Sequence, residues 1–310
     1  HKKIQTKIYN RRDFQTSKTQ EGNMEPNEKT FTSQANFHLA GIIPVAGGQT
    51  SLNFPFPDVM LPVANDYTLL DAAVVECAYA GCDTIWIVCN DDTSPLLRYR
   101  IGDYIEDPAY YYYNTSKNKD HRKRIPIFWV PQHPKDRDKR DCLSWSVVYG
   151  ALNAFKVSAN ISKWMIPDKY YVSFPYGLSN PRVVMANRKH YRTEKNYYMV
   201  KDNKTVQDNI YTSFTFGKEE FIKFRKNIRK GTGRFKGDYK KMEALPIEQR
   251  WSARFFELKD VFNDLDLNSA NLLLVKDFFN IASWEDYLVY AKSDYANRIE
   301  KPPKDLFSYK

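Results

Sequence analysis

The chain has 310 residues, of which 42% are hydrophobic and 15% aromatic, and it carries a formal net charge of +10. This composition excludes a chain that is disordered throughout, because such chains are poor in apolar and aromatic residues. Its apolar runs are shorter than the roughly 18 residues that cross a bilayer, and its polar first residues differ from a signal peptide, so the sequence predicts a cytoplasmic protein with no membrane partner.

Two parts of the chain differ in pattern. Residues 1–36 are polar, charged and aperiodic, which predicts a flexible N-terminal arm. Residues 37–310 alternate apolar runs with helical patterns and show neither a linker nor a repeat, which predicts a single α/β domain. The expected elements of this domain, in chain order, are a strand at 39–47, a helix at 68–81, a strand at 83–90, a helix at 94–107, an exposed loop at 109–120, a strand at 124–132, a helix at 141–155, a strand at 169–177, a basic hairpin insertion near 182–207, a strand at 209–217, helices at 218–231 and 254–265, a strand at 271–283 and a closing helix at 284–300.

The first three elements set the fold class. The run LAGIIPVAG is continuously apolar and ends in glycine, as is typical of a strand that is buried on both faces. The next segment, from Thr68 to Gly81, has apolar residues at helical spacing and a glycine stop, and DTIWIVCN reads as a second buried strand. This order predicts a Rossmann-like, mixed and mostly parallel sheet flanked by helices.

The cysteines and the basic residues point to no specific ligand. Cys77, Cys82, Cys89 and Cys142 fit no zinc-site spacing, and we expect reduced thiols. The stretches 117–140 and 218–241 together carry more positive charge than the net excess of the whole chain. Solvated loops and helix faces explain them, and an anionic ligand or nucleic acid is the alternative. A nucleic-acid partner is not expected, because no such binding motif accompanies them.

Several motifs occur in an order that resembles a known family. The resemblance is to the sugar-nucleotide pyrophosphorylases, which are nucleotidyltransferases, and it runs from about Leu39 to Ala291. PVAGGQTSL resembles the family's glycine-rich signature A-G-x-G-T-R-L, and FFNIASWEDYLVYA resembles its closing motif W-x-D-I-G-T-x-E-D-Y-L. The matching segments are PVAGGQTSL at 44–52, FPDVMLPVANDYTLLDAAV at 56–74, AGCDTIWIV at 80–88, VPQ at 130–132 and FFNIASWEDYLVYA at 278–291.

The resemblance implies a glycosyltransferase-A-like fold of the nucleotide-diphospho-sugar transferase type. It implies that the glycine-rich loop holds a nucleotide and that a sugar phosphate lies beyond the carboxyl edge of the sheet. General rules agree, because open parallel sheets bind ligands at that edge and a glycine turn lets backbone N–H groups approach phosphate. For Gly47 and Gly48 the alternative is a tight turn without a ligand. The implied nucleotide-binding residues are Ala46, Gly47, Gly48, Gln49, Thr50 and the base-contacting Gln132.

The positions that carry charge in the family are substituted here. The loop arginine falls on Ser51, the following lysine on Asp58, the first metal-binding aspartate near Tyr176 and the second on Asn280. Nucleotidyl transfer depends on cations that neutralise developing negative charge, and Mg²⁺ needs anionic oxygen ligands. The substitutions therefore predict a protein that binds a nucleotide or nucleotide sugar, uses no metal or other cofactor, and has lost the usual pyrophosphorylase chemistry.

One alternative is an active, diverged sugar-1-phosphate nucleotidyltransferase or a glycosyltransferase with relocated catalytic groups. Asp91 and Asp92 would then hold Mg²⁺, although a solvated turn or helix cap explains them as well. For His133 the simpler interpretation is a loop histidine with no chemistry. The side chains that could supply positive charge are His133, Lys135, Arg137 and Arg140.

A second alternative is a non-catalytic interaction or regulatory module with a protein partner. In that case side chains would fill the pocket and no nucleotide would bind. The carboxylates of Glu285 and Asp286 are expected to cap a helix under any of these hypotheses, because they lie at its first turn. The side chains that could fill the pocket are Phe54, Phe56, Met60 and Tyr176.

Overall fold

The fold comes from a computed structural model that describes residues 37–48, 50–109, 123–231, 235–236, 243–244, 256–303 and 306–308. The expected arm at 1–36, Gln49 and nearly all of the expected loop at 109–120 lie outside these residues. The strands are β1 (Leu39–Pro44), β2 (Pro62–Ala64), β3 (Tyr67–Thr68), β4 (Thr84–Cys89), β5 (Tyr104–Glu106), β6 (Arg124–Pro131), β7 (Lys169–Val172), β8 (Gly177–Ser179), β9 (Tyr197–Val200), β10 (Phe214–Phe216), β11 (Phe235–Lys236), β12 (Glu243–Ala244), β13 (Asn271–Leu274) and β14 (Phe278–Asn280).

The helices connect these strands. The α-helices are α1 (Leu69–Ala80), α2 (Ser94–Ile101), α4 (Pro134–Arg140), α5 (Leu143–Ile161), α6 (Pro181–Ala186), α7 (Arg188–Tyr191), α8 (Lys218–Gly231), α9 (Leu258–Phe262), α10 (Trp284–Ala291) and α11 (Asp294–Arg298), and the short 3-10 helices are η1 (Asp58–Met60), η3 (Lys163–Met165) and η4 (Val206–Asp208). None of the described helices combines the length and the apolarity needed to cross a membrane.

The described strands form a large sheet in the order β13-β9-β10-β7-β1-β4-β6-β5. Strands β7, β1, β4 and β6 are mutually parallel, whereas β10 and β5 run antiparallel to their neighbours. The chain moves outward from β1 through β4 and β6 and then returns to the other side of β1 at β7. This reversal creates a switch point at the carboxyl ends of β1 and β7, where such sheets bind ligands. The expected mixed, mostly parallel α/β fold is confirmed.

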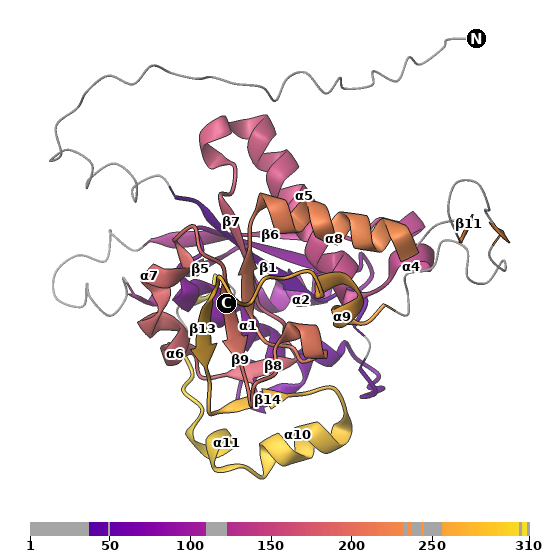
Figure 1. Cartoon of the computed structure of the whole chain (residues 1–310). Coiled ribbons are helices and arrows are strands. Elements are labelled where there is room, and N and C mark those ends of the chain that lie inside the picture. Colours follow the sequence, from indigo (N-terminus) through magenta and orange to yellow (C-terminus); the bar gives the residue numbers. More distant parts are fainter. Residues whose placement is uncertain are drawn as a thin grey trace, which may run out of the picture. The chain divides into compact units, whose positions relative to one another are not determined.

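Helices α1 and α5 cover opposite faces of β1 (Figure 1). A Cβ atom on Gly41 would lie 3.0 Å from Sγ of Cys77 on α1, so this glycine lets the helix approach the strand. The next residue, Ile42, points to the other face, where its side chain meets Gly150 of α5. Helix α8 packs beside α5, so one face carries α5 and α8 and the other carries α1.

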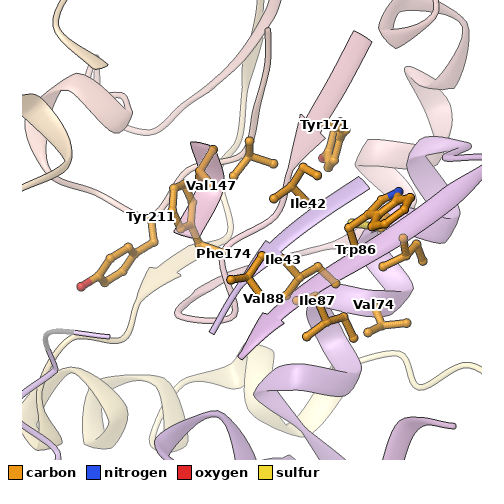
Figure 2. Close-up of a cluster of buried hydrophobic side chains, with 14 of the residues drawn as sticks. Ile42, Ile43, Val74, Trp86, Ile87, Val88, Val147, Tyr171, Phe174 and Tyr211 are labelled. Atoms are coloured by element: carbon orange, nitrogen blue, oxygen red, sulfur yellow. The ribbon is translucent and has the colours of Figure 1, made fainter. Parts of the chain in front are cut away.

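The core lies between these layers and the sheet. Figure 2 shows side chains of β1 and β4 in its middle, with Val74 supplied by α1 and Val147 by α5. Helix α1 begins and ends as its sequence predicts, because Thr68 forms a capping box with Asp71 and Gly81 adopts a left-handed φ of 85°. All four cysteines are buried free thiols.

The expected basic hairpin near 182–207 is wrong. The segment forms α6, α7 and then β9, which lies inside the main sheet between β13 and β10. The predicted turn exists, since Asp202 and Asn203 have φ values of 49° and 61° and Lys201 pairs with Lys204. The turn leads through η4 to β10, which pairs antiparallel with β9 inside the main sheet, so the charged residues flank buried strands instead of forming a surface ribbon.

Some expected elements divide in two. The helix expected at 94–107 ends at Gly102, and the chain continues as the short strand β5. The closing strand at 271–283 separates into β13 and β14, which belong to different sheets. The closing helix at 284–300 separates into α10 and α11, since Ser293 caps a new helix.

Candidate functional site

The loop after β1 is held between β4 and the start of α5. The backbone N–H of Ala46 donates to the carbonyl of Val88 at 2.9 Å, and Ser146 Oγ donates to the carbonyl of Ala46 at 2.7 Å. Gly47 has a φ of +76°, and a Cβ atom there would lie 2.5 Å from the backbone nitrogen of Cys142. A side chain is excluded by both the left-handed backbone and this close approach, so glycine is required.

The same loop presents backbone donors. No described residue accepts a hydrogen bond from the backbone N–H of Gly47, Gly48 or Thr50. Gly48 is exposed, and Gly47 and Thr50 are half-buried. Neighbouring N–H groups in a glycine turn are an arrangement that binds anions. The backbone donors of Gly47, Gly48 and Thr50 are therefore not used by other described residues, and nucleotide binding by this loop stays a prediction.

Two of the substituted family positions meet this loop. The Thr50 hydroxyl donates to the carboxylate of Asp58. The Tyr176 hydroxyl lies 2.7 Å from where a Cβ atom on Gly48 would be, and Tyr176 is only 3% exposed. Burial, and then the nearby Asp58 carboxylate, raises the pKa of Tyr176 far above its usual value. The loop is therefore bordered by a carboxylate and a neutral phenol where the family carries a lysine and a metal-binding aspartate.

The remaining two positions lie beside Tyr176. Asn280 of β14 is paired with Gly177 of β8, and its Oδ1 accepts from the backbone N–H of Tyr211 at 2.8 Å. The backbone N–H and the Oγ of Ser51 both donate to the carbonyl of Ala282, at 3.0 Å and 3.4 Å. Across the described residues, no group of three or more His, Cys, Asp or Glu side chains could hold a metal ion.

Gln132 lies at the end of β6, and its backbone N–H donates to the carbonyl of Cys89 in β4 at 2.8 Å. Its side chain is 1% exposed, yet neither the oxygen nor the nitrogen of its amide has a partner in the described part of the chain. An unsatisfied buried polar group costs about 1–3 kcal/mol, so a ligand or ordered water is expected to satisfy this amide.

Three further buried polar atoms without a described partner lie at the same edge: Asn90 Oδ1, Ser144 Oγ and Trp145 Nε1. Asn90 follows β4, and the other two lie in the first turn of α5. Sequence reasoning missed all three, although the rule that ligands bind at strand ends points to Asn90. The end of β4, the end of β6 and the start of α5 thus combine unused donors and acceptors.

The two aspartates after β4 are engaged by α4. Arg137 donates to Asp91, and it also donates to Asp92 at 3.2 Å. Asp92 Oδ1 additionally accepts from the backbone N–H of Thr93 at 2.9 Å, as in a strand-end turn. A relocated Mg²⁺ on this pair would have to displace the guanidinium group of Arg137.

The other cations predicted as replacements make local contacts. His133 Nδ1 accepts from the backbone N–H of Lys135 at 3.1 Å and so caps α4. Lys135 itself is exposed. The Arg140 guanidinium lies over the Trp145 ring, 4.7 Å from its centroid. None of these described contacts brings a positive charge to the glycine loop.

A cavity of about 160 Å³ opens beside Gly47. It is smaller than the roughly 300–1,000 Å³ of typical ligand pockets. One acidic side chain, Glu257, lies on its wall and is paired with Lys259 at 2.5 Å. The lining residues are Gly47, Leu143, Asn209, Tyr211, Phe256, Glu257 and Leu258.

The aromatic side chains expected to fill the pocket behave differently from one another. Tyr176 occupies the position against Gly48, as described above. Phe54 and Phe56 instead stack on each other with centroids 5.0 Å apart, and Trp284 meets Phe54 edge-on at 5.8 Å. Phe56 and Trp284 are 40% and 43% exposed, so this group forms a surface platform. Met60 is half-buried and packs against the core.

Comparison with known proteins finds similar structures but no similar sequences. No protein-family model matches the sequence, and no curated protein sequence matches it. Among solved structures, a Bacillus anthracis protein assigned as a glucose-1-phosphate thymidylyltransferase is similar at 12% identity and a TM-score of 0.52, over 86% of this chain and 98% of that one. An apo UDP-glucose pyrophosphorylase is similar at 13% identity and a TM-score of 0.51, over 84% of this chain and 99% of that one.

A UDP-glucose pyrophosphorylase complexed with UDP-glucose is similar at 14% identity and a TM-score of 0.50, over 84% of this chain and 100% of that one. At this level of identity, the likeness concerns the fold. The chain therefore has the nucleotidyltransferase fold of the sugar-nucleotide pyrophosphorylases.

Proposed function

We propose that this chain binds a nucleotide or nucleotide sugar at the carboxyl ends of β1, β4 and β6, and that it does not carry out the pyrophosphorylase reaction. The proposal that the chain binds a nucleotide rests on the buried amide of Gln132, which has no partner among the described residues. A nucleobase edge presents donors and acceptors in one plane and would satisfy both ends of this amide. The free N–H groups of Gly47, Gly48 and Thr50 would then receive the phosphates.

We propose that the pyrophosphorylase reaction is lost because of the charges around the glycine loop that follows β1. A triphosphate that approached Gly48 would meet Asp58, whose negative charge repels it. Tyr176 and Asn280 offer a neutral phenol and an amide oxygen that is already hydrogen-bonded, so they are poor substitutes for two carboxylates around Mg²⁺. Removing one contact that stabilises a transition state typically slows an enzyme about a hundred- to a thousandfold.

The size of the cavity favours a second candidate, a non-catalytic interaction module. At about 160 Å³ the cavity beside Gly47 does not accommodate a whole nucleotide without movement. The exposed platform of Phe54, Phe56 and Trp284 would then contact a protein partner. We also propose a reducing, cytoplasmic location, on the ground that all four cysteines are free thiols.

A thermal-shift screen tests the proposal. Nucleosides, nucleoside triphosphates and nucleotide sugars are added with and without Mg²⁺, because a ligand that binds only the native state raises the unfolding midpoint. We expect a shift from at least one nucleotide class that does not depend on Mg²⁺, and no pyrophosphate release from a sugar 1-phosphate and a triphosphate. A shift that requires Mg²⁺, together with turnover, would support the active transferase instead. The absence of any shift would favour the interaction module.

A further inference from the structure

At one edge of the main sheet, formed by β5, another part of the chain pairs with the outer side of the strand. At the β5 edge, Phe307 forms a bridge with Ile105, and the backbone N–H of Ser308 donates to the carbonyl of Tyr104 at 3.1 Å. Ser308 Oγ in turn accepts from the backbone N–H of Asp103 at 2.8 Å. Phe307 is 5% exposed. A segment far along the sequence therefore closes this edge.

Strand β13 forms the opposite edge, beside β9 (Figure 1). The backbone N–H of Asn271 donates inward to the carbonyl of Asn196, the residue before β9, at 2.8 Å, and that of Val275 donates to the carbonyl of Val200 in β9 at 3.0 Å. Because hydrogen-bonding direction alternates along a strand, Leu272 and Leu274 direct their backbone groups outward. No residue in the described part of the chain pairs with this outer side. The side chains of Leu272 and Leu274 are 53% and 72% exposed.

Strand β13 is short, which limits pairing at its edge, but it lacks the other features that usually protect an edge. Natural edge strands carry charges, prolines or bulges that prevent pairing with another strand. Here the strand reads Asn-Leu-Leu-Leu, and its register with β9 is regular over all four residues. A regular, apolar edge with unused backbone donors and acceptors is a template for an added strand.

We propose that a second copy of this chain pairs antiparallel with β13 and joins the two sheets across a twofold axis at Leu273. In this register Leu272 lies opposite the partner's Leu274, and each such pair exchanges two hydrogen bonds. Side chains of directly opposed residues share a face, so the exposed leucines of both copies form one apolar cluster. The pairing is self-complementary, as a twofold interface requires.

The charges near the strand permit this pairing. About an axis at Leu273, Lys276 lies opposite the partner's Ala270, so the two lysines do not face each other. Like charges placed directly opposite would oppose the pairing. Because β13 has only four residues, the interface is small, and we expect a weak dimer whose population rises with concentration.

Sedimentation velocity over a range of concentrations tests the proposal. The expected result is a shift from monomer to dimer that is lost in the double variant Leu272→Lys/Leu274→Lys. Leu274→Pro should also abolish the dimer, because it removes an outward N–H and leaves the bonds to β9 intact. Val289→Lys is the matched control, since Val289 is an apolar residue that is 64% exposed on α10, and it should leave the dimer unchanged.

A cross-link tests the register. Leu273→Cys should form an intermolecular disulfide under oxidised glutathione, because the axis places it opposite its own copy, whereas Leu274→Cys should not. A monomer at every concentration would overturn the proposal, as would a dimer that survives both the lysine and the proline variants. A monomer in which the Leu272 and Leu274 amides resist hydrogen exchange would show that the same chain covers the edge, and it would overturn the proposal too. Nucleotide-induced shifts should be the same in all these variants, so this test is independent of the proposed function.

Discussion

Glu76 of α1 is a buried carboxyl group that should make stability depend on pH. Its Oε1 accepts from the Tyr171 hydroxyl at 2.9 Å, and its Oε2 accepts from Ser179 Oγ at 3.4 Å. Burial disfavours the charged form more strongly than these hydrogen bonds support it, and it raises the pKa of Glu76 from 4.5 to about 7. We expect the isosteric and always neutral variant Glu76→Gln to remove this dependence.

The direction of this pH dependence follows from the protons that the native and unfolded states bind at Glu76. Between pH 4.5 and about 7 the native state holds a proton on Glu76 that the unfolded state has released. The protonated Glu76 therefore contributes its full stabilisation of the native state below pH 4.5. This contribution is lost as the pH rises to about 7, the pKa of Glu76 in the folded protein. A pKa difference of about 2.5 units corresponds to about 3 kcal/mol of unfolding free energy.

Urea unfolding of wild type and Glu76→Gln at a series of pH values measures this effect. Relative to the variant, the wild type should lose about 3 kcal/mol between pH 4.5 and 7, with no further relative change at higher pH. Glu285→Gln, on the exposed first turn of α10, is the control and should follow the wild type. Parallel pH curves for wild type and Glu76→Gln would refute the reasoning.

The remaining predictions concern the site. Gln132→Met should raise the unfolding free energy by about 1 kcal/mol, because it removes unpartnered polar atoms, and it should abolish the nucleotide-induced thermal shift; a retained shift would contradict the assigned base contact. Gly47→Ala should lower the thermal midpoint more than Gly48→Ala, because the first meets rigid backbone at the start of α5 and the second meets only the Tyr176 hydroxyl; the reverse order would show that the loop is placed differently. Asp58→Lys should tighten triphosphate binding in low salt, as measured by calorimetry, and no change would show that Asp58 is distant from the phosphates.

Much of the fold is predictable because its strongest signals are local. The parallel strands β1 and β4 are continuous apolar runs, and α1 carries both of its caps in the sequence. The segment around β9 misled the prediction, since its charged flanks and its turn at Asp202 and Asn203 resemble a surface hairpin while the strand between them is buried. Strand β5 was missed because it has only three residues and begins directly after α2 and Gly102, where the helical pattern was read as continuing.

In the sequence, the residues of the candidate site are connected only by the order of their motifs. That order correctly brought Asp58 and Tyr176 to the glycine loop. The ion pairs of Arg137 with Asp91 and Asp92 connect side chains far apart in sequence, and such pairs leave no periodic signal. The unpartnered burial of Gln132 likewise depends on the surrounding tertiary structure.

The central claim is that the nucleotide cleft persists without the charges that drive pyrophosphorylase chemistry. The most direct measurement compares, by isothermal titration calorimetry, the affinities of the common ribonucleosides with those of their triphosphates, each with and without Mg²⁺. We predict that at least one nucleoside binds, that its triphosphate binds less than about tenfold more tightly (about 1.4 kcal/mol), and that Mg²⁺ changes neither value. A triphosphate that binds far more tightly than its nucleoside, or only with Mg²⁺, would contradict the account, and so would a protein that binds none of them.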